Sequence, residues 1–239
     1  MDFSNKYIIG FSLALCLVCS LAVSAAADQL KELQDANILQ DTQVQILRLT
    51  GLIGENEKPN TEETNKLFQE KIIIHEVETE TGTILGQGEF KPNEFIKAFK
   101  GGMPKTFNVL EVPKDGSFVF LVWGKGLWGP MYAYIHVGAD KNTVKGLKFY
   151  AHIETPGLGA EVDSDYFREQ WPGKKLFDPS DPEKNIVIDV TKKGKVTTPE
   201  YEVDGITGAT ITSVAVGDLL QKWFSKERYG NFLAMEVNR

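Results

Sequence analysis

The stretch Asp204-Gly-Ile-Thr-Gly-Ala-Thr210-Ile-Thr-Ser213 leads a glycine-containing turn into an amphipathic segment, so it predicts a helix that begins near Thr210. The apolar residues that recur at helical spacing are Val216, Leu219, Leu220, Trp223 and Phe224. A helix start has unpaired backbone N–H groups and the positive end of the helix dipole, which together favour a phosphate ester on Thr210. The alternative is an ordinary capped helix, with Thr210 or Thr212 as N-cap and Gly208 in the turn. Short motifs recur by chance, so the pattern alone favours the capped helix.

A resemblance to a known sequence signature favours the phosphate ester on Thr210 over the capped helix. The residues Asp204-x-x-Thr207-Gly-Ala-Thr210 resemble the signature Asp-x-x-Ser/Thr-Gly-Ala-Thr, on which flavin transferases esterify FMN through its phosphate. Three more features occur in order before it: an N-terminal apolar segment, the run Gly126-Leu-Trp-Gly-Pro-Met-Tyr-Ala-Tyr134, and the run Glu154-Thr-Pro-Gly-Leu-Gly-Ala-Glu161. Over nearly the whole chain, this order resembles the C subunits of Na⁺-translocating NADH:quinone oxidoreductases.

The resemblance implies that Thr210 carries covalent FMN as a phosphoester, added after export by a flavin transferase that uses FAD. Asp204 would then belong to the signature that the transferase recognises, and we expect no catalytic residue in this chain. The residues expected at the cofactor are Thr207, Gly208, Ala209, Ile211 and Thr212 of the motif, Thr155, Gly157 and Leu158 of the preceding run, and Glu154 and Trp128 beside them.

The resemblance also implies an electron carrier in a membrane redox complex. Electrons would enter from the NADH-oxidising side, pass through this FMN to a second flavin subunit and then to quinone, coupled to Na⁺ export. The chain has no NADH fingerprint and one spanning segment, so NADH oxidation and ion conduction would lie in partner subunits. A covalent bond removes dissociation, which allows the flavin edge to stay open at a surface.

Two alternatives stay open. The G subunit of an Rnf ferredoxin:NAD⁺ complex has the same linkage and related forms of the same runs. An anchored scaffold or binding module without flavin would reduce the motif to a helix cap. Covalent flavin would separate the scaffold from the two redox complexes, and neighbouring genes would separate the complexes from each other.

The N-terminal segment 7–27 is uncharged and matches the roughly 20 residues that cross a bilayer as a helix. Val23-Ser-Ala-Ala-Ala27 offers a signal-peptidase site, but a signal peptide has an apolar region of only about 7–15 residues, so length favours an uncleaved anchor. Lys6 before the segment places the N-terminus in the cytoplasm. We therefore expect a single-pass protein of the bacterial inner membrane with its domain on the periplasmic side.

Composition limits the other possibilities. The chain has 239 residues, 42% of them hydrophobic, which supports one sizeable domain plus an anchor. A formal net charge of −7 argues against nucleic-acid binding, which needs a basic face. Cys16 and Cys19 lie within the apolar segment, where they fit small buried residues better than a redox pair. Three histidines without ligand spacing indicate no metal site.

The remaining pattern predicts an α+β fold, in which hairpin-linked strands form an antiparallel sheet with flanking helices. We divide the chain into an anchor (1–27), a membrane-proximal helical linker (28–60) and an FMN-binding domain (61–239). Residues 28–49 read as one helix or two short ones. The other predicted helices are 61–69, 93–99, 163–171 and the one from Thr210, and the predicted strands are 71–79, 107–112, 118–123, 131–137, 144–153 and 186–190.

Overall fold

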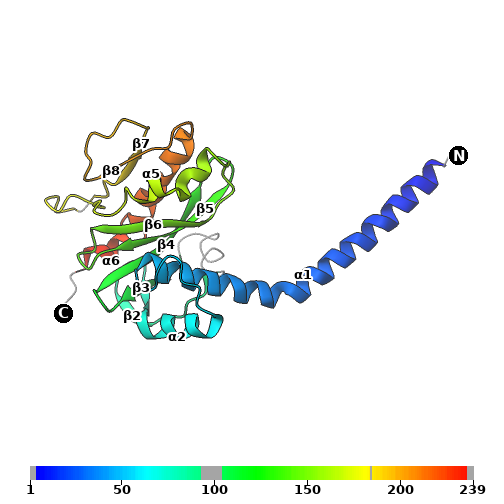
Figure 1. Ribbon diagram of the computed structural model, residues 1–239, viewed down its shortest axis with the longest axis horizontal. Coiled ribbons are helices and arrows are strands. Elements are labelled where there is room, and N and C mark those ends of the chain that lie inside the picture. The colour runs from blue at the N-terminus through cyan, green and yellow to red at the C-terminus, as the bar shows by residue number, and fades with distance from the viewer. Residues whose placement is uncertain (1–3, 93–103, 184, 236–239) are drawn as a thin grey trace.

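A single long helix forms the N-terminal arm of the molecule. The computed structural model describes residues 4–92, 104–183 and 185–235. Helix α1 (Asn5–Leu49) runs unbroken for 45 residues, so 28–49 is one helix continuous with the apolar segment. Its N-terminal part projects away from the rest of the protein (Figure 1) and is the one helix of the described residues that is long and apolar enough to cross a membrane.

The last turns of α1 pack against the domain. Ile46 and Leu47 are fully buried, and Ile53 in the following loop is 8% exposed. Helix α2 (Thr61–Lys71) begins after a capping box in which Asn60 accepts from the Glu63 N–H and Glu63 accepts from the Asn60 N–H. The predicted helix 61–69 is thus confirmed, two residues longer than expected.

The centre of the domain is a six-stranded sheet in the order β2-β1-β3-β4-β5-β6, with every neighbouring pair antiparallel. Its strands are β1 (Ile73–Glu78), β2 (Ile84–Gln87), β3 (Thr106–Val112), β4 (Ser117–Lys125), β5 (Pro130–Val137) and β6 (Val144–Ala151). The α+β prediction is confirmed. Within this sheet the sequence does not predict β2, because all four of its residues are exposed and carry no alternating pattern.

Helices cover both faces of this sheet, as the period-2 pattern of β4 requires. Phe118, Phe120 and Val122 lie in a core with α5 (Thr210–Phe224) and α6 (Gly230–Ala234). Val119 and Leu121 face the other way, into a second core with α1 and α2. Figure 1 shows the two helical layers on opposite sides of the strands.

The segment between β6 and α5 differs most from the prediction. The helix expected at 163–171 is only a 3₁₀ turn, η1 (Gly159–Asp163), and one turn of α-helix, α4 (Asp165–Arg168), because Pro172 follows closely and Trp171 is drawn into the core. The strand expected at 186–190 is β7 (Asp189–Thr191), which pairs in parallel with the unexpected β8 (Glu202–Asp204). The helix expected at 93–99 lies outside the described residues.

Candidate functional site

The buried carboxylate of Glu154 brings three distant segments together. Glu154 is 5% exposed. Its Oε1 accepts from the Trp128 N–H at 3.0 Å, and its Oε2 accepts from Thr212 Oγ1 at 2.6 Å. The loop between β4 and β5, the loop after β6 and the first turn of α5 therefore meet at this side chain. These are the three segments that the sequence predicts to share a site.

Helix α5 begins without a side-chain cap. Its N-cap is Ala209, and Thr210 is its first helical residue. The capped-helix interpretation is therefore wrong in its choice of cap, since Thr212 donates its hydroxyl to Glu154 instead. The first amide of the helix that bonds backward is Ser213 N–H, which donates to Ala209 O at 2.9 Å. Among the described residues no protein acceptor faces the N–H groups of residues 210–212, so this helix start is open.

The motif divides into buried and exposed residues. Thr207, Gly208 and Thr210 are exposed, whereas Ala209 and Thr212 are buried. Gly208 has a φ of +76°, the left-handed conformation expected of a glycine in this turn. The buried residues hold the turn from inside, and Thr210 is left exposed at the helix start.

Large apolar side chains stand exposed on the same three segments. Trp128 is 66% exposed, Ile153 64%, Leu158 44% and Ile211 61%, and we call these four residues the apolar rim. Leu158 reaches the motif turn, because a Cβ on Gly208 would lie 3.0 Å from Leu158 Cδ2. The exposure of Trp128 contrasts with Trp171 and Trp223, which are fully buried in the core. Exposed apolar side chains on neighbouring segments are typical of a binding surface.

The rest of the second run builds the loop that carries Leu158. The Thr155 carbonyl accepts from the N–H groups of Leu158 and Ala160, both at 3.1 Å, and Gly157 has a φ of +74°. Thr155 and Gly157 are exposed. His152 fixes the other end of the loop: its Nδ1 accepts from the Glu154 N–H at 3.3 Å, and its Nε2 lies 2.8 Å from Asp163 Oδ2.

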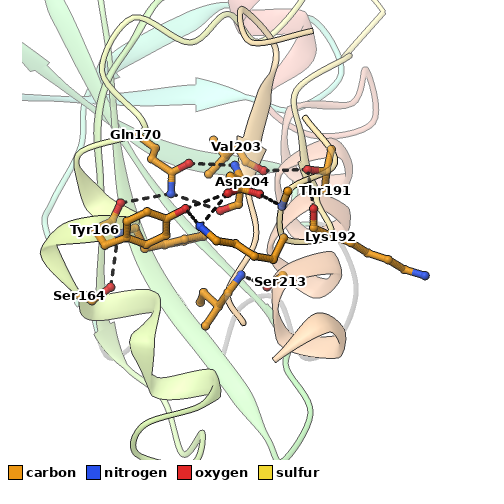
Figure 2. Close-up of polar contacts among 12 residues, drawn as sticks. Ser164, Tyr166, Gln170, Thr191, Lys192, Val203, Asp204 and Ser213 are labelled. Atoms are coloured by element: carbon orange, nitrogen blue, oxygen red, sulfur yellow. Dashed lines mark hydrogen bonds and ion pairs between the residues drawn. The ribbon is translucent and has the colours of Figure 1, made fainter. Parts of the chain in front are cut away.

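Asp204 lies at the end of β8 and is held by three donors (Figure 2). Its Oδ2 accepts from Tyr166 Oη at 2.9 Å and pairs with Lys193 Nζ at 2.8 Å, and its Oδ1 accepts from the Gly194 N–H at 2.5 Å. We call these four residues the Asp204 clamp. Partial burial alone would raise the pKa of Asp204, but the donors and the positive charge of Lys193 outweigh it and lower that pKa below its usual value.

The histidines take structural positions. His75 Nε2 lies 2.6 Å from Glu111 Oε2, and His136 is buried with Nε2 2.7 Å from Ser117 Oγ. Across the three described ranges, no group of three or more His, Cys, Asp or Glu side chains could hold a metal ion.

The comparisons with known proteins bear on this geometry. The profile of the FMN-binding domain family matches residues 126–225, a range that contains every segment of the site. The C subunit of the Na(+)-translocating NADH-quinone reductase of Yersinia pestis is 33% identical over 92% of this chain and 88% of its own length. Its counterpart in Vibrio campbellii is 34% identical over 97% of this chain and 95% of its own. The chain belongs to this C-subunit family.

Solved structures of the C-subunit family agree. The C subunit of the Na(+)-translocating NADH-quinone reductase from Parabacteroides distasonis matches with a TM-score of 0.68 at 31% identity, over 87% of this chain and 98% of its own. NqrC from Shewanella oneidensis shares the fold, with a TM-score of 0.69 at 24% identity over 84% of this chain and 96% of its own.

Sequence reasoning misses two groups of residues at the site. Ile153 is one of the rim residues, and its only signal is an apolar residue at the end of a strand run, directly before Glu154. Tyr166 and Lys193 of the clamp have no signal at all, because they meet Asp204 from 38 and 11 positions away in the chain.

Proposed function

We propose that this chain is the membrane-anchored FMN subunit of a Na⁺-translocating NADH:quinone reductase. In this proposal Thr210 carries the FMN as a phosphoester, and the subunit relays electrons from the NADH side to the next flavin subunit and quinone, coupled to Na⁺ export. The observation that carries the proposal is that Thr210 is exposed at the open start of α5. Membership of the C-subunit family supplies the redox context.

The residues at the site fit an FMN group attached in this way. The free N–H groups at the start of a 15-residue helix, together with its dipole, stabilise a phosphate beside Thr210. The apolar rim offers Leu158, Ile211 and Trp128 to cover part of an aromatic ring and exclude water from it. Glu154 lies behind the site and holds its three segments. FMN, when bound, supplies the electron-transfer chemistry, and the protein supplies its position and electrostatics.

Attachment requires one group transfer. The Thr210 Oγ–H bond breaks, and Oγ bonds to the FMN-side phosphorus of FAD while the phosphoanhydride bond breaks and AMP leaves. The hydroxyl proton goes to a base on the flavin transferase, since no basic side chain of this chain contacts Thr210 among the described residues. Residues Thr207, Gly208, Ala209, Ile211 and Thr212 shape the turn that presents Oγ, and Thr155 and Gly157 shape the loop opposite.

We propose that residues 7–27 cross the inner membrane once, with the N-terminus in the cytoplasm and the domain on the periplasmic side. The apolar stretch of α1 is exposed along its whole length, which suits lipid or the helices of partner subunits. The divisions 1–27, 28–60 and 61–239 are proposed as divisions of function alone. Helix α1 runs unbroken through the first boundary, and Ile53, which lies before the second, packs within the domain core. The partners are the other subunits of the complex and, during maturation, the flavin transferase.

No observation favours the alternatives. The relatives named above are C subunits of the Na⁺-translocating reductase rather than G subunits of an Rnf complex. A scaffold without flavin would have no use for an exposed apolar rim around an open helix start.

The test is in-gel ultraviolet fluorescence of the denatured full chain, co-expressed and exported with a flavin transferase. Wild type and Thr207→Ala are expected to give a fluorescent band, and Thr210→Ala none. Fluorescence on Thr210→Ala would refute the assigned residue. A dark wild type beside a flavinylated positive control would refute the proposed function.

A further inference from the structure

We infer that Asp204 serves flavin attachment from inside the protein, as the centre of a clamp that fixes the turn before Thr210, and that Lys193 is a positioning residue for this reaction. The inference rests on the proposed function. It gives Asp204, which the sequence analysis places in the signature recognised by the transferase, a role within the fold, and it assigns a part in attachment to residues outside the motif.

The carboxylate of Asp204 is already occupied within the protein. Three donors from two separate segments reach it: Tyr166 on α4, and Lys193 and Gly194 in the loop between β7 and β8. Its side chain is 21% exposed. Lys193 Nζ also contacts the Tyr166 hydroxyl and lies 4.0 Å from the centre of the Tyr166 ring. A flavin transferase that bound this carboxylate directly would first have to displace Lys193 from its charge-assisted pair with Asp204.

The main chain of Asp204 is held as well. Its N–H donates to Gln170 Oε1 at 2.9 Å, and its carbonyl accepts from Gln170 Nε2 at 3.2 Å. The Gln170 amide thus pairs with Asp204 as a neighbouring strand would. Figure 2 shows Tyr166 and Gln170 both facing Asp204 from the same side.

The turn that follows is tied to the first turn of α5. Ile206 N–H donates to Ser213 Oγ at 2.9 Å, and Ser213 Oγ donates to Ala209 O at 2.9 Å. Gly205 lies so close to β7 that a Cβ on Gly205 would collide with the carbonyl oxygen of Thr191. The exposed residues of the motif therefore lie in a turn that is held at both ends, by the clamp before it and by the start of α5 after it.

This geometry determines where Thr210 Oγ stands. If the clamp opens, the end of β8 keeps its bonds to Gln170 and its pairing with β7 but loses the side-chain bonds of Asp204, so the turn is held less firmly. Group transfer depends on the position of the attacking atom, and a misplacement of about 1 Å costs on the order of a hundredfold in rate. Loss of one charge-assisted hydrogen bond in the clamp should slow attachment by about tenfold.

The experiment measures the rate of flavin incorporation into the detergent-solubilised full chain, with purified flavin transferase and FAD, by in-gel fluorescence over time. Lys193→Met and Tyr166→Phe are each expected to slow incorporation by about tenfold, and Lys193→Arg to restore most of the rate. The matched control is Lys195→Met, an exposed lysine two positions along that should retain the wild-type rate. Asp204→Asn is measured alone and with Lys193→Met, and the second change should then have less than about a twofold further effect, because the clamp is already open.

Hydrogen exchange at residues 205–209 gives a readout independent of the transferase. It should rise in Lys193→Met and Asp204→Asn and stay unchanged in Lys195→Met. Wild-type incorporation by both Lys193→Met and Tyr166→Phe would overturn the inference. So would slow incorporation with unchanged exchange, which would make Asp204 and Lys193 direct contacts of the transferase. Flavin that survives Thr210→Ala, or a wild type that takes up none, would instead refute the proposed function itself.

Discussion

Acid should weaken the junction between the anchor helix and the domain through His136. Burial, and after it the positive charge of Lys145, lowers the pKa of His136 from its usual 6.5 to about 4, while Asp115 and a hydrogen bond to the Leu49 backbone oppose the shift. Between pH 4 and 6.5 the folded protein therefore binds fewer protons at this site than the unfolded chain does. Stability falls as the pH falls through that range.

The magnitude follows from the two pKa values. Each pH unit between them is worth about 1.4 kcal/mol, so the His136 contribution that is lost between pH 7 and pH 4 is about 3 kcal/mol of the free energy of unfolding. Asp115 adds little in this window, because its hydrogen bonds and Lys145 outweigh its burial and hold its pKa at about 2.

The assay is urea unfolding of the detergent-solubilised full chain at pH 7, 6, 5 and 4, followed by tryptophan fluorescence. His136→Gln, which does not titrate, is the reference, since carboxylates elsewhere titrate alike in both proteins and cancel in the difference. The stability of wild type relative to His136→Gln should fall by about 3 kcal/mol as the pH falls. A difference that is flat with pH, or that grows in acid, would refute the reasoning.

Three further substitutions and one control test the site and its supports, each by the same unfolding assay at pH 7. Glu154→Ala leaves two buried or half-buried donors without their acceptor and should cost about 2–4 kcal/mol; no loss of stability would mean that the three segments meet without it. Gly205→Ala should cost about 1–3 kcal/mol through its backbone collision, whereas Gly86→Ala, with open space around it, should change stability by less than about 0.5 kcal/mol; equal effects would contradict the close approach. Trp128→Ala should also change stability by less than about 0.5 kcal/mol, because Trp128 is 66% exposed, and a larger loss would place its side chain in the core.

The elements with a regular apolar pattern were predictable from the sequence. Strands β3 to β5 are buried at most positions and β6 at half of its positions, and helix α5 has a continuous apolar stripe. Their apolar sequence patterns follow from this burial. Strand β2 is fully exposed and β8 is short, and each exists because a neighbouring strand offers free backbone groups. Pairing of that kind leaves no trace in side-chain type.

The site divides along the same line. The motif around Thr210 is contiguous, so its turn and helix start could be predicted, and resemblance placed the loops of Trp128 and Leu158 beside it. The N-cap, Ala209, could not be predicted, because hydroxyl side chains are preferred at that position. The Thr212 hydroxyl instead donates to Glu154, a contact between distant parts of the chain. The Asp204 clamp depends on tertiary contacts alone.

Because α1 is unbroken, the number of residues in it sets both the distance of the domain from the N-terminal end of the helix and the direction in which the domain faces. Residues 28–38 are exposed, and packing on the domain begins only beyond them, so this part of the helix is a free-standing stalk. Each residue of an α-helix advances the chain by about 1.5 Å and turns it by about 100°. Inserting two residues in the stalk would swing the Thr210 face by about 200°, away from any partner it served. Inserting seven would raise the domain by about 10 Å with its heading almost unchanged. If the proposed flavin at Thr210 is to face the same neighbour, this stalk can lengthen in evolution only in steps close to whole helical turns.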